Sequence, residues 1–375
     1  MTRVRSPTHA GSWYSSSRSF KRFHPLRIKS STASLKDSLR SWLDQAHTPV
    51  NEPEDSNQSS RLNEEQGWKS VCVDVPLKGC RAIIAPHAGY AYSGRAAAWA
   101  YKVIDPTEIK RVFVLGPSHH LYLQRCALTK CDVYDTPIGS LPVDKSINNE
   151  LRETGMFDQM SLRTDEDEHS IELHLPYIRQ VFKDHDIKIV PILVGSISSD
   201  QELEYGELLA PYLSDRENFF VISSDFCHWG SRFSYTYFRD PESSDNKPIN
   251  LSSIETSEFK SPCPIHRSIE ALDKEAIDLI SLSRLDLRVV GDLGWIHERF
   301  TSYLRRTKNT ICGRHPIGIL LGSVISLRSY SVEDSQTGGS EEVIELRFVR
   351  YEQSSQCITR KDSSVSYASG FLTII

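Results

Sequence analysis

Histidine, cysteine and aspartate cluster directly after three runs of apolar residues. The runs cover residues 81–86, 111–117 and 218–224, and the polar residues that follow them are His87, Ser118, His119, His120, Asp225, Cys227 and His228. Imidazole nitrogens bind metal ions and exchange protons near neutral pH. A single histidine in such a place is better explained as a hydrogen-bonded loop residue, but three occurrences at the same position in the pattern favour metal binding or acid–base chemistry.

The elements that position these residues are short strands alternating with helices. Continuous apolar runs at 81–86, 111–117, 187–195 and 218–225 are typical of strands buried on both faces. Helical patterns follow at 94–104, 171–184, 201–213, 267–282 and 314–327. The alternation predicts an α/β fold, a single domain with a mostly parallel central sheet flanked by helices, and residues 341–351 and 364–375 add a late antiparallel pair.

The polar residues after the apolar runs are expected to meet in space. Ligands of open α/β sheets bind outside the carboxyl ends of the strands, and all these residues follow such ends. Adjacent side chains of an extended segment point to opposite faces, so only one of His119 and His120 is expected to point inward. Asp225 and His228 are candidates for an outer partner and a proton carrier.

A cysteine lies just before the last predicted helix, in "NTICGRHPIGILL" (309–321). The helix dipole and the neighbouring Arg314 and His315 are expected to favour the thiolate form of Cys312. The alternative is that Cys312 packs in the core as a small apolar side chain without a chemical role. Two histidines and one anionic side chain resemble the ligands of non-haem iron enzymes. A thiolate in place of the usual carboxylate favours copper(I) and still permits iron or zinc.

The segment "TDEDEHSIELHLPY" (164–177) is less informative than its charges suggest. His169 and His174 are five positions apart, which places them off a common helix face, so we do not expect them to form a metal pair. Whether Glu168 or His169 contributes to the site at the strand ends is left open by the sequence.

Composition excludes several classes of function. The chain has 375 residues and a formal net charge of −5, so nucleic acid is not an expected partner. Eight cysteines without a Cys-x-x-Cys pair indicate reduced thiols. The apolar run at 317–327 is shorter than the ~18 residues of a membrane span. Eight basic residues precede Asp37, as in a transit peptide or a solvated basic arm.

Several motifs together resemble the Memo family, mediators of receptor-driven cell motility. The resemblance spans residues 7–375 and is carried by "THAGSWY", "RAIIAPHAGYAYSG", "LGPSHH", "TDEDEHSIELHLPY", "VPILVG", "SSDFCHWG", "NTICGRHPIG" and "SSVSYASG". It implies a fold similar to that of the class III extradiol dioxygenases. It also implies a metal-binding redox protein using copper or iron, and an adaptor in phosphotyrosine and cytoskeletal signalling, in the cytoplasm and the nucleus.

Matching the family's motifs to this chain assigns roles to individual residues. The resemblance implies His87, His119 and Cys312 as metal ligands, and Asp225 and His228 in the same pocket, with His228 resembling the dioxygenase base. Those dioxygenases use a glutamate as third ligand, which argues against ring cleavage here.

The resemblance also bears on the ends and loops of the chain. Residues 1–375 form one domain on this interpretation, with insertions at 18–30, 48–80 and 239–264. Because "THAGSWY" belongs to the fold of the family, cleavage of the basic N-terminus as a transit peptide is disfavoured.

Three hypotheses follow. The first is a metal-dependent redox protein, with enzymatic turnover left open. The second is an adaptor that binds a peptide carrying phosphotyrosine, for which Arg95, Arg125 and Arg314 are available as charge partners. The third is a cysteine hydrolase with Cys312 as nucleophile and His228 or His315 as base.

Overall fold

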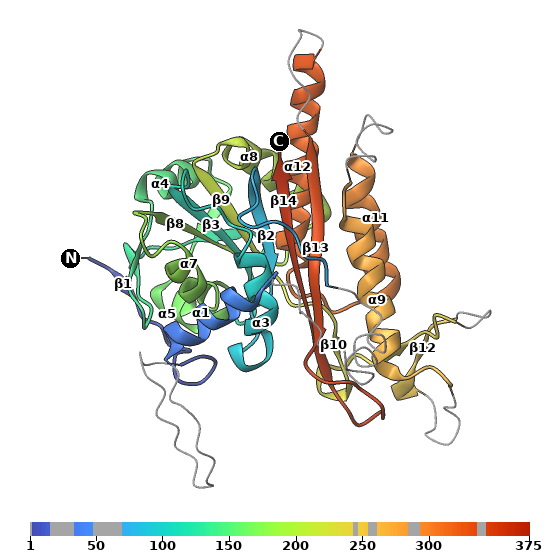
Figure 1. The fold of residues 1–375 in the computed structure, drawn as a ribbon. Coiled ribbons are helices and arrows are strands. Elements are labelled where there is room, and N and C mark those ends of the chain that lie inside the picture. Colours follow the sequence, from blue (N-terminus) through green and yellow to red (C-terminus); the bar gives the residue numbers. More distant parts are fainter. Residues whose placement is uncertain are drawn as a thin grey trace.

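A mixed β-sheet forms the centre of the molecule (Figure 1). The computed structural model describes residues 2–15, 34–47, 70–242, 247–253, 261–283, 293–335 and 343–375. The strand order is β10-β14-β2-β9-β3-β8-β4-β7, and β13 pairs with the outer side of β14. These strands are β2 (Cys80–Ala85), β3 (Arg111–Pro117), β4 (Cys126–Leu128), β7 (Phe157–Gln159), β8 (Lys188–Val194), β9 (Asn218–Ser223), β10 (His228–Trp229), β13 (Ile344–Gln353) and β14 (Ser364–Ile374).

The parallel strands occupy the middle of this sheet. β9 pairs in parallel with β2 on one side and β3 on the other, and β3 pairs in parallel with β8. β14 and β4 then join antiparallel to β2 and β8, so the sheet is mixed at its flanks. The α/β fold is confirmed, and so is the late antiparallel pair, formed by β13 and β14. The predicted likeness to the extradiol dioxygenases stays a prediction.

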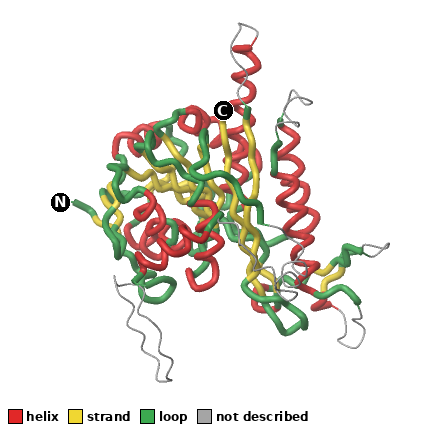
Figure 2. The backbone as a smooth tube through the Cα atoms, in the orientation of Figure 1, coloured by secondary structure: helices red, strands yellow, loops and turns green. Residues whose placement is uncertain are grey.

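Helices cover both faces of the sheet, as the tube in Figure 2 also shows. Successive residues of a strand point to opposite faces, and accordingly Ile84 packs in one core and Ile83 in the other. The first core is closed by α8 (Ser199–Ser214), α9 (Ile265–Ile280), α11 (Gly294–Thr307) and α12 (Arg314–Ser335). The second is closed by α1 (Leu35–Gln45), α3 (Tyr90–Tyr101) and α7 (Leu175–Val181).

α12 lies directly against α8. A Cβ atom at Gly206 would come within 2.6 Å of the Cα atom of Gly322, so the two backbones approach too closely for a side chain at this crossing. α12 continues to Ser335, beyond the end of the helix predicted at 314–327. Residues 336–342 lie outside the described part of the chain.

The predicted helix at 171–184 is broken into α6 (His169–Glu172) and α7. Pro176 lies in the first turn of α7, where its missing N–H costs nothing, and in a continuous helix the same residue would lack one hydrogen bond. α4 (Lys145–Glu153) and α5 (Leu162–Asp167) are short helices near this break.

The smaller elements tie down the chain ends and loops. β1 (Val4–Arg5) pairs with β5 (Val133–Tyr134), which also pairs with β6 (Leu141–Pro142). β11 (Tyr237–Phe238) pairs with β12 (Ile249–Asn250), so part of the predicted insertion at 239–264 forms regular structure. The insertion at 18–30 and residues 48–69 of the second insertion lie outside the described residues. Among the described helices, none has the length and apolar character that crossing a membrane requires.

Candidate metal centre

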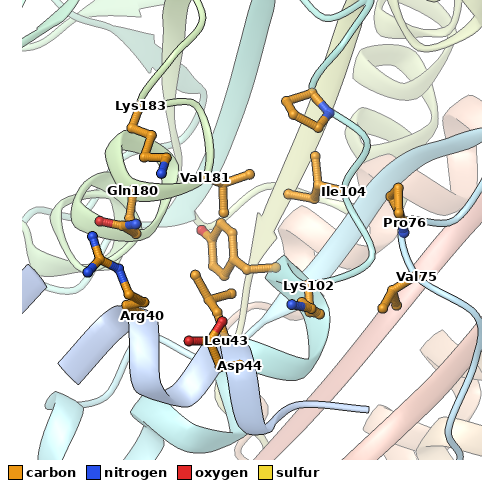
Figure 3. Close-up of a pocket in the computed structure, with 12 residues that line it drawn as sticks. Arg40, Leu43, Asp44, Val75, Pro76, Lys102, Ile104, Gln180, Val181 and Lys183 are labelled. Carbon is orange, nitrogen blue, oxygen red and sulfur yellow. The ribbon is translucent and has the colours of Figure 1, made fainter. Parts of the chain in front are cut away.

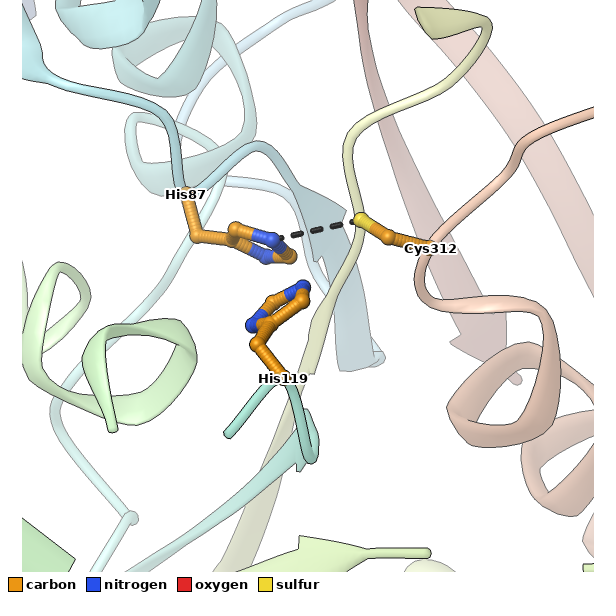
Figure 4. Close-up of side chains that lie close together, drawn as sticks. All are labelled: His87, His119 and Cys312. Atoms are coloured by element: carbon orange, nitrogen blue, oxygen red, sulfur yellow. Dashed lines mark hydrogen bonds between the residues drawn. The ribbon is translucent and has the colours of Figure 1, made fainter. Parts of the chain in front are cut away.

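His87, His119 and Cys312 converge on one point (Figure 4). His87 and His119 follow β2 and β3, which flank β9 in the sheet, and Cys312 precedes α12. One ligand atom from each residue lies within 4.8 Å of the others. Nε2 of His87 is 3.2 Å from Sγ of Cys312, although the residues are 225 positions apart in the chain. The structure therefore brings together the ligand set that the family resemblance implied, while its metal binding stays a prediction.

Ser223, the last residue of β9, orients the ring of His87. Its hydroxyl donates to the carbonyl of Ser170 at 2.8 Å, so it accepts the Nδ1–H of His87 at 2.6 Å. The free lone pair of His87 is therefore on Nε2, which faces Cys312. Burial, followed by the neighbouring His119 and other histidines, holds the pKa of His87 well below its ordinary value. The ring is neutral at pH 7, which is the form that binds metal ions.

Glu168 orients His119 in the same sense. Its carboxylate accepts the backbone N–H of His119 at 2.7 Å and lies 2.9 Å from Nδ1 of the ring. Burial opposes ionisation of this carboxyl, but the hydrogen bond from His119 and its charge outweigh burial and lower the pKa of Glu168 to about 2. An ionised carboxylate accepts the Nδ1–H, which leaves Nε2 of His119 as the ligand atom. Carboxylate–histidine pairs of this kind commonly support metal ligands.

Backbone contacts place Cys312 between β9 and α12. The N–H of Asp225 donates to Sγ at 3.3 Å, and the N–H of Gly313 donates to Oγ of Ser224 at 3.2 Å. A Cβ atom at Gly313 would lie 2.3 Å from the carbonyl oxygen of Ser223, so only glycine permits this approach.

The prediction that Cys312 gains thiolate character is wrong for the metal-free protein. Burial raises the pKa of Cys312 well above its ordinary value and the Asp225 carboxylate raises it further, against the smaller effect of backbone N–H groups. His315 does not assist, because its Nδ1 is bonded to Glu202 on α8 at 2.6 Å. A bound metal ion would have to displace the thiol proton.

Asp225 and His228 lie beside this group, as expected for residues that follow β9. Oδ1 of Asp225 accepts the backbone N–H of His87 at 2.9 Å, so this side chain holds the loop rather than the imidazole. Burial raises the pKa of Asp225. Nδ1 of His228 lies 2.9 Å from the carbonyl oxygen of Phe226 and 3.1 Å from that of Thr310, so Nδ1 carries the hydrogen and Nε2 can accept a proton. The catalytic roles of both residues stay predictions.

The N-terminal segment forms another wall of the site, which residue-by-residue reasoning missed. Arg5 is fully buried, with Nε 3.2 Å from Asp165 and a terminal nitrogen 2.7 Å from Glu172. Trp13 packs on the ring of His169 at 4.3 Å between centroids. The only sequence signal for this wall was the motif "THAGSWY", and the burial of Arg5 shows that part of the basic N-terminal segment belongs to the fold.

His169 stacks on His119, with ring centroids 4.4 Å apart and planes 15° apart. Glu168 and His169 therefore enter the site, an outcome the sequence had left open. His174 points elsewhere and bonds through Nδ1 to the hydroxyl of Tyr101 at 2.8 Å. Exposed His120 lies beside His169, with centroids 5.8 Å apart.

A cavity of about 430 Å³ lies apart from this centre (Figure 3). It is bordered by α1, the residues before β2 and the ends of α3 and α7, and its lining includes Arg40, Val75, Lys102, Gln180 and Lys183. None of the histidines or cysteines of the candidate centre lines it, so we assign it no part in the chemistry.

Comparisons with known proteins decide the family. The model of the family described as Memo-like protein matches residues 69–371. The chain belongs to the Memo family. "Protein MEMO1" of Xenopus laevis is 42% identical over 372 residues, covering 99% of this chain and 97% of that protein. The human "Protein MEMO1" is 45% identical over 311 residues, covering 82% and 90%.

The family extends to more distant animals. The "Protein memo-1 homolog" of Caenorhabditis elegans is 37% identical over 371 residues, covering 99% of this Memo-family chain and 83% of the relative. An uncharacterized protein from Escherichia coli K12 of known structure covers 77% of the chain at 13% identity with a TM-score of 0.38, too distant a likeness to support an argument. The resemblance seen in the motifs is thus confirmed at the level of the family.

Proposed function

We propose that this Memo-family protein is a metal-binding redox protein whose His87, His119 and Cys312 hold a copper or iron ion. The observation that carries the proposal is the convergence of Nε2 and Sγ atoms from three separate segments. Ligands at about 2.0–2.1 Å (nitrogen) and 2.3 Å (sulfur) from one ion lie about 3.1–3.6 Å from each other. The 3.2 Å between His87 Nε2 and Cys312 Sγ fits this range.

The residues around the ligands suit the same purpose. Ser223 and Glu168 hold the Nδ1 protons of the two histidines, so both rings present a lone pair without rearrangement. A copper or iron ion held by two imidazoles and a thiolate supplies one-electron chemistry. The acceptor nitrogen of His228 can take up or return a proton during such a reaction.

Elemental analysis of protein purified without a histidine tag tests the proposal. We expect copper or iron in the wild type and loss of that metal in Cys312→Ala. Cys263→Ala is the matched control, because Cys263 is also a half-buried free thiol but lies outside the centre. Equal metal content in all three proteins would refute the site.

Oxygen consumption by the metal-loaded protein then tests for turnover. His228→Asn keeps a donor toward the Phe226 carbonyl and removes the acceptor nitrogen. We expect unchanged metal content and slower oxygen consumption in this variant. Equal rates in both proteins would remove the proton-carrier role of His228.

Peptide binding by an adaptor is the second candidate function. It is favoured by exposed aromatic side chains, one packed on the histidines and two close to them in the chain. Trp13 packs on His169, Tyr92 follows His87 at the start of α3, and Tyr122 follows His120. Of the arginines considered as phosphate partners, Arg125 already bonds to the Gly155 carbonyl and lies 3.7 Å from Asp158. A titration with one peptide in phosphorylated and unphosphorylated form tests this candidate, and equal affinities would exclude phosphate recognition.

Thiol-directed hydrolysis is less well supported. The imidazole next to Cys312 is that of His87, neither His228 nor His315, and the pKa values of both partners favour a neutral thiol and a neutral ring. The links to cell motility and signalling, and a location in cytoplasm and nucleus, stay predictions from the family.

A further inference from the structure

Glu168 is also at the centre of a second group of candidate ligand atoms. One atom each of His119, Glu168 and His169 lies within 4.8 Å of the others. Oε1 of Glu168 is 2.9 Å from Nδ1 of His119 and 3.6 Å from Nδ1 of His169. Nitrogen and oxygen ligands at about 2.0–2.2 Å from one ion lie about 2.9–3.6 Å apart for angles between about 90° and 120°. Both measured distances fall in that range.

The unsatisfied nitrogen of His169 is an independent observation. Its Nδ1 is buried and has no hydrogen-bond partner among the described residues. The ring cannot easily turn to find one, because it is packed between Trp13 and His119. A buried polar atom without a partner costs about 1–3 kcal/mol, so a polar group or an ion is expected to satisfy it.

Support of His119 by Glu168 explains only half of this arrangement. A carboxylate that orients a ligand histidine accounts for the 2.9 Å contact with His119. It leaves the nitrogen of His169 unexplained, 3.6 Å from the same carboxylate oxygen.

We infer that His119, Glu168 and His169 bind a second divalent transition-metal ion next to the first. Two imidazoles and a carboxylate suit borderline ions such as Zn²⁺ or Cu²⁺. The inference shares two residues with the proposed function. Nε2 of His119 serves the first centre and its Nδ1 the second, and Glu168, which orients His119 in the first, is a ligand in the second. Binding of both ions would require His119 to release its Nδ1 proton to the solvent, so that each ring nitrogen could serve one ion.

Equilibrium dialysis of the full-length, tag-free protein against chelator-buffered Zn²⁺, followed by elemental analysis, tests the inference. His169→Phe keeps an aromatic ring between Trp13 and His119 but removes the ligand nitrogen. His120→Phe is the matched control, because exposed His120 is the neighbouring histidine and belongs to neither group. We expect both ions in the wild type and in His120→Phe, and a single ion in His169→Phe and in Cys312→Ala.

The pattern across the variants separates the two centres. A single ion in the wild type that is kept in His169→Phe and lost in Cys312→Ala would overturn the second site and leave the proposed function intact. A single ion lost in His169→Phe and kept in Cys312→Ala would overturn the proposed centre instead. No zinc in the wild type would overturn the second site, whereas the copper or iron centre is tested separately by elemental analysis of the purified protein.

A spectroscopic measurement covers the case in which His169→Phe folds poorly. Cys312→Ala loaded with Co²⁺ is expected to show the weak ligand-field absorption of a nitrogen–oxygen site without thiolate-to-cobalt charge transfer. Absence of any cobalt absorption in that variant would also overturn the second site.

Discussion

Ser223→Ala is the sharpest test of how the protein prepares His87 for a metal ion. The hydroxyl of Ser223 is fully buried between two partners, the Nδ1–H of His87 at 2.6 Å and the carbonyl of Ser170 at 2.8 Å. Alanine leaves the Nδ1–H of His87 without an acceptor and the carbonyl of Ser170 without a donor. Each buried polar group left unsatisfied costs about 1–3 kcal/mol, so for the two groups we expect the metal-free variant to lose about 2–6 kcal/mol of unfolding free energy.

The same change is expected to weaken metal binding for a separate reason. Without an acceptor at Nδ1, the ring gains by moving its hydrogen to Nε2, which then donates to Cys312 Sγ 3.2 Å away. The lone pair would be turned away from the centre. Loss of an outer partner typically lowers metal affinity about 10–100-fold, which corresponds to about 1.4–2.7 kcal/mol.

Chelator-competition titration of the metal and urea unfolding of the metal-free protein measure these two effects. Ser369→Ala is the matched control, because Ser369 is an equally buried serine whose hydroxyl donates to the carbonyl of Ala96 at 2.6 Å. We expect the control to lose stability but keep its metal affinity. If Ser223→Ala binds metal as tightly as Ser369→Ala, the hydrogen bond from His87 to Ser223 does not contribute to metal affinity.

Three further substitutions test other parts of the structure. Gly313→Ala places a methyl group 2.3 Å from a carbonyl oxygen, so we expect a loss of about 1–3 kcal/mol in unfolding free energy together with weaker metal binding; unchanged metal affinity would show that the Cys312 loop adapts. Burial raises the pKa of Asp273 to about 6, so the carboxyl group holds its proton more tightly in the folded than in the unfolded protein. The free energy of unfolding of the wild type should therefore fall as pH rises from about 4 to 6, whereas Asp273→Asn lacks this dependence. The shift of about two pKa units corresponds to about 3 kcal/mol, and parallel stability–pH curves for the two proteins would contradict it. Arg5→Met removes the buried cation between Asp165 and Glu172, so we expect a loss of about 3–5 kcal/mol in unfolding free energy and faster proteolysis near the N-terminus. A wild-type digestion pattern would show that Arg5 does not anchor this segment.

Much of the fold follows from local patterns in the sequence. Continuous apolar runs predicted β2, β3, β8 and β9, and the helices α8, α9 and α12 lie where apolar periodicity placed them. The sequence also predicted that the polar residues after these strands lie close together, because parallel strands end at a common edge of the sheet. The break between α6 and α7 did not follow, since apolar periodicity runs through Pro176 and gives no sign of where the helix restarts.

The identity of the supporting residues depended on tertiary structure. Ser223 and Glu168 fix the hydrogens of His87 and His119, yet no spacing in the sequence pairs them with those histidines, which are 136 and 49 positions away. The N-terminal wall is similar, because Arg5 meets its carboxylate partners about 160 positions further along the chain.

By itself, the sequence determined which residues end the buried strands, because strand formation depends on a pattern of neighbouring side chains. The tertiary structure alone decided which groups orient these residues and in what protonation state they are held. Cys312 shows the reason: its neighbours along the chain favoured a thiolate, but burial beside Asp225 raises the pKa of its thiol. Burial and charge are set by groups that only folding brings together, so the reactivity of a residue cannot be inferred from its immediate sequence.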